Sequence, residues 1–470
     1  MEYFKPDASY NTKFIFSLIS AIIYQLGSQV VVTIGNFCVY FASYIHLYQD
    51  WVNIQSCNIM APTILLLLAI FSPISGIIEK YIGPKLTLLL SSIIVQICLI
   101  LYYFQNNLYI FYTISVFIGI GNGISAGVPI KNACLYFPKR KGIINSTIIF
   151  IGGLTSMLYL IIGEKIINPD KKPIEKKNNN PVYPEDVANR AYYYFVFTMI
   201  IFPILTIIAL LLFYEYVPRE NQNGNKEKML PQKKGPMRTD TKEIIGTFRF
   251  WRNMIIITLM PFWVYFLTAT YRAYSTLLGL NQNFISYLPS IITFLSATIG
   301  LVWGYIFDKF GFQKIIMIMS IICIILSIYF TIFVGNKIMY TIGLIASTFI
   351  SRVGMMSVIN PHIMQVYEFR NYLIIGGFAR SFNQLSFFIA ASISVILSVK
   401  NKTSEDLETP YRIIASIGIV LSIIGFIFSF YEDDSKFNIK NDDNSKRENT
   451  LGIGHDETEN EAGAGDDKNV

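Results

Sequence analysis

The side chains best suited to bind a ligand are three polar residues inside one long apolar segment near the C-terminal end. Arg380, Asn383 and Gln384 stand at positions i, i+3 and i+4, so a helix places them on one face. A charge in lipid is costly, which makes such a residue a functional candidate, and a guanidinium binds a carboxylate through two parallel hydrogen bonds. The pattern favours an anion-binding cavity; a structural contact between helices is the alternative.

Three further cations interrupt apolar segments. Arg272 shares a helical face with Tyr265 and Thr268, and it either lines the same cavity or reaches outward to lipid headgroups. Arg352 either faces the cavity or is buried against a bonding partner. Lys131 lies two helical turns from the end of its segment, where a lysine extends readily to the membrane surface. We predict that Lys131 does so, and both arginines stay binding candidates.

Neutral polar residues form a second group of candidates. Gln25, Gln29, Thr33 and Asn36 lie within one face of the first apolar segment, where they either line a cavity or bond to a neighbouring helix. We favour the cavity, and we add Asn122 from the fourth apolar segment as a further binding candidate.

The acidic residues are placed differently. No Asp, Glu or His lies deep in any apolar segment, because Glu79, Glu164 and Asp308 all stand at segment ends. Proton-coupled carriers generally need a titratable group within the membrane. We therefore expect charge balance to come from an anion, or from exchange of anions, and not from a proton on an intramembrane carboxylate.

Enzymatic chemistry has little support in the sequence. His-Glu-x-x-His does not occur, and five cysteines with three histidines leave little material for metal sites. We expect no enzyme activity, no cofactor and no metal. The net charge of +7 is explained by membrane orientation, so nucleic acid is not an expected partner.

Composition indicates an all-α membrane protein. Apolar residues make up 53% and charged residues 15% of the 470 residues, against roughly 25% charged residues in soluble domains. A spanning helix needs about 20 mostly apolar residues, and such long runs must be helices because lipid offers their backbones no other partner. Twelve runs qualify: 14–41, 59–79, 86–104, 108–136, 143–163, 191–216, 251–276, 284–307, 315–334, 338–360, 373–399 and 411–431.

The runs divide into two sets of six. Residues 1–216 form an N-terminal half and 251–431 a C-terminal half, joined by a basic linker at 217–250 that should be cytoplasmic. Residues 432–470 carry twelve acidic and five basic residues, a composition typical of a disordered tail. Both termini are then expected in the cytoplasm, although the outer loop 164–190 with six Lys and Arg residues runs against this orientation.

A repeated motif lies at matching places in the two halves. Each copy has a glycine for close helix approach, a carboxylate that can pair with a base or cap a helix N-terminus, and a second glycine that turns the chain. A bistable ion-pair latch there would hold one side of the bundle shut. The copies are Gly76, Glu79, Lys80, Gly83 and Lys85 after the second run, and Gly304, Asp308, Lys309, Gly311 and Lys314 after the eighth.

These paired loops resemble the signature loops of the major facilitator superfamily. The resemblance covers about residues 10–431 and implies twelve transmembrane helices in two pseudo-symmetric halves, with substrate bound between them. Gly119-Ile120-Gly121-Asn122-Gly123 and Tyr136-Phe137-Pro138-Lys139-Arg140-Lys141-Gly142 are similar to motifs of its oxalate/formate antiporter and monocarboxylate carrier branch, and other positions look like protozoan members.

That narrower resemblance implies a secondary active transporter of small organic anions such as monocarboxylates. Arg380 is the nearest match to the branch's basic substrate-binding residue in span eleven, and its second basic residue, in span eight, has no counterpart here. A single carboxylate is therefore expected, carried by a monomer in the plasma membrane or an internal membrane. The alternatives are a carrier of a sugar, amino acid, nucleoside or drug, and a non-transporting receptor.

Overall fold

A computed structural model describes residues 8–34, 37–52, 60–137, 140–173, 175–177, 180–216, 241–350, 352–367, 369–400 and 404–430. The predicted tail at 432–470 and most of the predicted linker, 217–240, lie outside these residues. Within them, twelve helical segments are long and apolar enough to cross a membrane. The prediction of an all-α membrane protein with twelve spans is confirmed.

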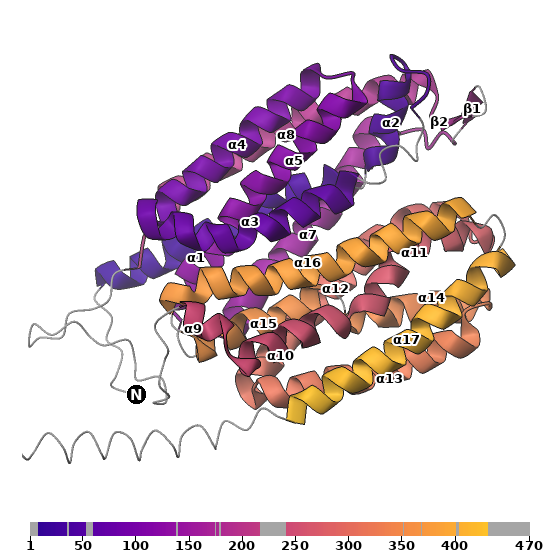
Figure 1. The fold of residues 1–470 in the computed structure, drawn as a ribbon. Helices are drawn as coiled ribbons and strands as arrows, with labels where there is room; N and C mark the ends of the chain where they lie inside the picture. The colour runs from indigo at the N-terminus through magenta and orange to yellow at the C-terminus, as the bar shows by residue number, and fades with distance from the viewer. Residues whose placement is uncertain are drawn as a thin grey trace, which may run out of the picture.

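The helices form two groups, seen in Figure 1 as an indigo-to-magenta group and a rose-to-yellow group. The first group contains α1 (Ala8–Ile34), α2 (Cys38–His46), α3 (Met60–Ile82), α4 (Pro84–Phe104), α5 (Leu108–Ser125), α6 (Val128–Leu135), α7 (Lys141–Ile167) and α8 (Glu185–Leu212). The second contains α9 (Thr241–Ile245), α10 (Phe248–Leu259), α11 (Phe262–Leu277), α12 (Gln282–Phe310), α13 (Phe312–Phe333), α14 (Lys337–Ala346), the 3-10 turn Ser347–Ile350, α15 (Arg352–Val366), α16 (Phe369–Lys400) and α17 (Ser404–Phe430).

A small hairpin stands outside the helical plan. Strands β1 (Glu175–Lys177) and β2 (Asn180–Val182) pair antiparallel, with Glu175 opposite Val182, in the loop between α7 and α8. Figure 1 places the hairpin beside α2, at the end of the first group away from α9. Apolar periodicity gave no signal for so short a pair of strands.

Four predicted spans are interrupted, which corrects the expectation of continuous helices. The fourth breaks at Ala126 and Gly127, where Gly127 has φ +91°. The seventh breaks before Phe262, because Pro261 has no amide hydrogen to donate. The tenth passes through a 3-10 turn between α14 and α15, and it continues to Val366, beyond the predicted end at residue 360. The first predicted span, 14–41, also divides, since α1 ends at Ile34.

Each half has its own aromatic core. In the first half, the ring of Phe41 stacks on Phe195 with centroids 4.3 Å apart, and Tyr102 lies 4.3 Å from Phe111. In the second, the ring of Tyr274 stacks on Tyr411 at 4.4 Å. Large apolar side chains such as those of Ile325 and Leu211 remain exposed on the outside, as expected for a surface that faces lipid. Each half is thus held together by buried aromatic contacts of its own, and first-half residues such as Val128 and Cys134 also join the apolar core of the second half.

The halves meet through two long helix pairs, α3 with α16 and α7 with α12. Small residues allow this approach. A Cβ built on Gly76 would lie 2.6 Å from Cγ1 of Ile374, and one built on Gly377 would lie 2.5 Å from the backbone of Pro73. A Cβ on Gly153 would collide with the Cβ of Ala297. The contact between halves is thus close along both helix pairs.

This contact predicts a selective effect of one methyl group. The Gly153→Ala variant should lose about 1–3 kcal/mol of stability through overpacking, which outweighs the gain in helix propensity. The matched control is Gly425→Ala, whose Cβ would meet nothing closer than 3.6 Å and should keep or slightly raise the melting temperature. Thermal unfolding of the purified proteins in detergent measures both; equal melting temperatures would contradict the close contact.

Candidate functional site

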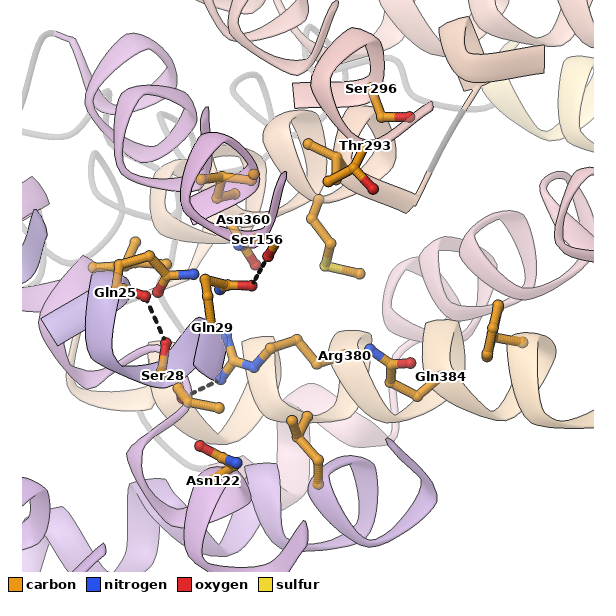
Figure 2. A pocket seen from close by; sticks show the side chains of 18 of the residues that line it. Gln25, Ser28, Gln29, Asn122, Ser156, Thr293, Ser296, Asn360, Arg380 and Gln384 are labelled. Carbon is orange, nitrogen blue, oxygen red and sulfur yellow. Dashed lines mark hydrogen bonds between the residues drawn. The ribbon is translucent and has the colours of Figure 1, made fainter. Parts of the chain in front are cut away.

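A cavity of about 390 Å³ lies between the two halves. Its walls come from α1, α5 and α7 on one side and from α11, α12, α15 and α16 on the other. Figure 2 shows the side chain of Arg380 extending from its helix across this space toward Gln29 and Asn122 of the other half. The cavity is the natural place for a ligand that both halves must contact.

Arg380 reaches the opposite half with two of its three nitrogens. Its Nε donates to Oγ of Ser72 at 2.7 Å, and its Nη2 donates to the backbone carbonyl of Ala126 at 3.0 Å. Nη1 is buried and makes no hydrogen bond of good geometry, although the Tyr372 hydroxyl on the same helix interacts with the guanidinium. Among the described residues, no carboxylate lies within 4.0 Å of the guanidinium. The cavity therefore holds a positive charge whose hydrogen-bonding capacity is not fully used.

The break in the fourth span makes room for this guanidinium. Gly127 adopts a left-handed backbone conformation, and a Cβ built on it would lie 2.7 Å from Nη1 of Arg380. Pro129 follows at the start of α6 and has no amide hydrogen to extend the helix backward. The Gly127-Val128-Pro129 sequence was the available signal for this break, hidden within an otherwise continuous apolar run.

The first-half wall of the cavity is rich in amides and hydroxyls. Gln29 Oε1 accepts a hydrogen bond from Oγ of Ser156 at 2.7 Å, and Oγ of Ser28 donates to the Gln25 carbonyl at 3.0 Å. Figure 2 shows both bonds on the same side of the cavity. Asn122 is 7% exposed, and its Nδ2 has no partner.

Most of the predicted binding residues lie together. Those that line the cavity are Gln25, Gln29, Asn122, Tyr265, Thr268, Arg380 and Gln384. Asn383 does not reach it: the residue is fully buried and its Nδ2 donates to the Tyr265 hydroxyl at 2.7 Å, so it supports a lining residue from behind. Asn36 and the side chains of Arg272 and Arg352 lie outside the described residues.

Sequence reasoning missed several lining or supporting residues. Ser72 and Ser156 are small hydroxyls common in any span, and Asn360 lies at the end of the tenth predicted run. Asn360 is 2% exposed; its Nδ2 donates to Oδ1 of Asn145 at 3.3 Å, and its own Oδ1 has no partner. A buried asparagine in each of two spans was the one sequence signal for this pair.

We use the term signature end for the end of the bundle that carries the turns at Gly83 and Gly311. Both glycines adopt positive φ, +82° and +78°, and each directly precedes a helix, as predicted for the turning glycine. Gly76 and Gly304 both lie where the halves touch, against Ile374 and Ser146 respectively. The two copies of the motif thus have matching backbone roles.

The two carboxylates of the motif have different partners. Glu79 forms an ion pair with Lys131 at 2.7 Å, and both side chains are nearly buried, 11% and 12% exposed. Lys131 therefore does not extend to the membrane surface as predicted, because its own half supplies a carboxylate in reach. Asp308 instead accepts hydrogen bonds from the backbone amides of Gly142 at 2.9 Å and Ile143 at 2.8 Å. It caps the N-terminus of a helix from the other half.

Further buried contacts close the signature end between the halves. Lys141 Nζ donates to the Met364 carbonyl at 2.8 Å, close to the C-terminus of α15, where a positive charge is favourable. Asn145 Nδ2 donates to the Met356 carbonyl at 3.3 Å. The motif lysines are exposed; Lys80 lies 3.4 Å from Oδ1 of Asn371, and Lys309 covers the Phe310 ring, while Lys85 and Lys314 also face outward. No group of three metal-ligating side chains occurs in the described part of the chain.

Two helical halves enclose a central cavity that contains a buried guanidinium. Residues 25–391 match the family model of the Major Facilitator Superfamily, and the chain belongs to this family. A comparison with curated protein sequences gives no match.

Solved structures show the same fold at low sequence identity. The outward conformation of FucP, the E. coli fucose:proton symporter, aligns with a TM-score of 0.59 at 15% identity, covering 90% of this chain and 100% of FucP. The proton:xylose symporter XylE aligns with a TM-score of 0.62 at 13% identity, covering 90% of this chain and 97% of XylE. The nucleoside transporter NupG aligns with a TM-score of 0.56 at 13% identity, covering 89% of this chain and 100% of NupG.

The cap on α7 predicts a measurable opening of the signature end. Asp308→Asn removes the negative charge from the helix N-terminus and should increase maleimide labelling of the native Cys134 by about three- to tenfold. Cys134 is fully buried beside the Lys141 carbonyl, and peptide mapping identifies its label. The control is Asp186→Asn, whose exposed ion pair with Lys172 should leave labelling unchanged. Equal labelling of Cys134 in both variants would show that the cap does not hold this end closed.

Proposed function

We propose that this transporter moves small organic anions, monocarboxylates among them. Family and fold make the chain a membrane transporter that works by alternating access. The observation that supports an anion as cargo is the Arg380 guanidinium, which lines the central cavity with one nitrogen unpaired and no carboxylate beside it in the described part of the chain. A bound carboxylate would balance this charge and use the free nitrogen.

Charge in a lipid-embedded cavity supports this choice of cargo. A buried cation is expensive unless it is paired and hydrogen-bonded, and the guanidinium fork matches the two oxygens of a carboxylate. A neutral substrate would leave the charge of Arg380 uncompensated in the loaded state. A cationic substrate would meet repulsion, because none of the lining residues is Asp or Glu.

Alternating access would place the motif residues in the gate. In this conformation buried hydrogen bonds of Asp308, Lys141 and Asn145 join the halves at the signature end. At the opposite end, a bond between the halves from Lys171 to the Tyr287 hydroxyl is exposed. We propose that the signature end is the cytoplasmic one, as its exposed lysines favour, and that both termini lie on that side. The halves 1–216 and 251–431 would then rock about the cavity.

Replacing the central charge tests the choice of cargo. Arg380→Gln should reduce uptake of a labelled monocarboxylate into proteoliposomes by about ten- to hundredfold, because a charge-assisted hydrogen bond is lost. Arg380→Lys keeps the positive charge but lacks the two parallel donors of the guanidinium, so its uptake should lie between those of the unmodified protein and Arg380→Gln. The control is Arg412→Gln, which removes an arginine 45% exposed at the far side of the second half. Full uptake by Arg380→Gln would contradict an anion site.

The described lining residues include no Asp, Glu or His, which favours exchange of anions over proton symport. Proteoliposomes preloaded with unlabelled anion should therefore take up labelled anion several-fold faster than empty ones. An imposed inward proton gradient should have little effect. Uptake that is driven by the proton gradient and indifferent to internal anion would contradict this coupling.

A neutral hydroxylated metabolite is the second candidate. The amides of Gln25, Gln29 and Asn122 in the cavity wall are suited to hydroxyl groups, as in sugar recognition. The same uptake assay separates the candidates: a carrier of neutral solute keeps its activity in Arg380→Gln, because nothing in its cargo needs the charge.

A further inference from the structure

The cavity contains three buried polar groups that have no partner, and they differ in kind. Nη1 of Arg380 and Nδ2 of Asn122 are donors, whereas Oδ1 of Asn360 is an acceptor. All three residues line the same cavity. Figure 2 shows the guanidinium between the labelled Asn122 and Asn360. Buried polar groups in native proteins are nearly always hydrogen-bonded. The three unpaired atoms are covered in this conformation but belong to side chains of one cavity wall, so a ligand that these side chains turn toward would complete them.

We infer that the substrate is a polyhydroxylated organic anion of the sugar-acid class, with its carboxylate on Arg380 and hydroxyl groups on Asn122 and Asn360. This inference rests on the proposed transport of anions and narrows its cargo. A hydroxyl both donates and accepts a hydrogen bond, so one kind of group satisfies the donor of Asn122 and the acceptor of Asn360. A carboxylate accepts only, and it leaves Asn360 unpaired.

Other polar substituents fit the site less well. An ammonium group donates to the acceptor of Asn360 but offers nothing to the donor of Asn122. It would also add a second positive charge near Arg380, and none of the lining residues is acidic. The chemistry of the three groups therefore favours an acid with hydroxyl groups over an amino acid.

The size of the cavity agrees with this class. A three-carbon acid has roughly six non-hydrogen atoms, and even at the about 30 Å³ of one water molecule each they occupy less than half of the available space. A six-carbon sugar acid has roughly thirteen non-hydrogen atoms, and even on the same generous scale it fits within the volume of about 390 Å³. Such a ligand would contact Asn122 of the first half and Asn360 of the second at once, as a cargo that couples the halves must.

Uptake into proteoliposomes with radiolabelled gluconate, glucuronate, lactate, alanine and glucose tests the inference. Gluconate or glucuronate should be taken up with a KM at least about tenfold below that of lactate. A KM for lactate equal to or lower than that of both sugar acids overturns the inference while leaving anion transport intact. Preference for alanine over the sugar acids also overturns it. If glucose is taken up and none of the acids is, the proposed function of anion transport is contradicted as well.

A variant at Asn122 tests the hydroxyl contact itself. Because Nδ2 of Asn122 bonds to no protein atom, Asn122→Leu leaves no broken protein bond. It should raise the KM for the preferred sugar acid about five- to tenfold and leave that for lactate nearly unchanged. The control is Asn168→Ala in the outer loop, where the amide bonds only to Lys172 of the same loop. Equal KM changes for both acids, or none for the sugar acid, would overturn the assignment of Asn122.

Discussion

Burial of one guanidinium between two helical bundles constrains most of what surrounds it. Arg380 has no carboxylate partner among the described residues, so its nitrogens depend on Ser72, on the Ala126 carbonyl and on whatever enters the cavity. The carbonyl is available because the fourth span breaks at Gly127, and only a glycine leaves room beside the guanidinium. Helix α3 must approach α16 closely for the bond to Ser72. The backbone of the first half is thus shaped to receive a charge from the second.

Length and apolarity predicted the spans, because a bilayer imposes both on every crossing helix. The role of the motif glycines could also be predicted from the sequence. Gly83 and Gly311 adopt positive φ at a tight turn, and the spacing of the motif indicates the position of that turn. The interruption at Gly127 gave only a weak signal, a glycine followed two residues later by Pro129, within a glycine-rich apolar run. Helical spacing in the sequence correctly predicted that Arg380, Gln384 and Thr268 line the cavity. The same spacing also predicted Asn383 as a lining residue, but Asn383 packs behind Tyr265.

Pairings between distant segments explain the remaining errors. The position of Lys131 near a span end predicted a solvated lysine, yet Glu79 lies across from it once α3 packs against the fourth span. Asn145 and Asn360 are 215 residues apart, and neither shows at sequence level that it bonds to the other. The two copies of the motif also differ in the partners of their carboxylates. Glu79 pairs with a residue of its own half, whereas Asp308 accepts hydrogen bonds from the other half. The periodicity of a sequence predicts which residues share a face of a helix. Only the packing of the helices determines which hydrogen-bond or ion-pair partner each residue meets.

The location of the bonds that join the halves has a consequence for how this chain can evolve. Asp308, Lys141 and Asn145 hold the signature end through backbone atoms, and none of them lines the cavity. In the proposed carrier, substitutions of Asp308 or Lys141 would alter how fast the two halves separate without touching the groups proposed to recognise cargo. Asn145 differs, because it also accepts a hydrogen bond from Asn360 of the cavity wall. In the proposed carrier, turnover and selectivity would then be under nearly independent control at Asp308 and Lys141, so one could change while the other is preserved.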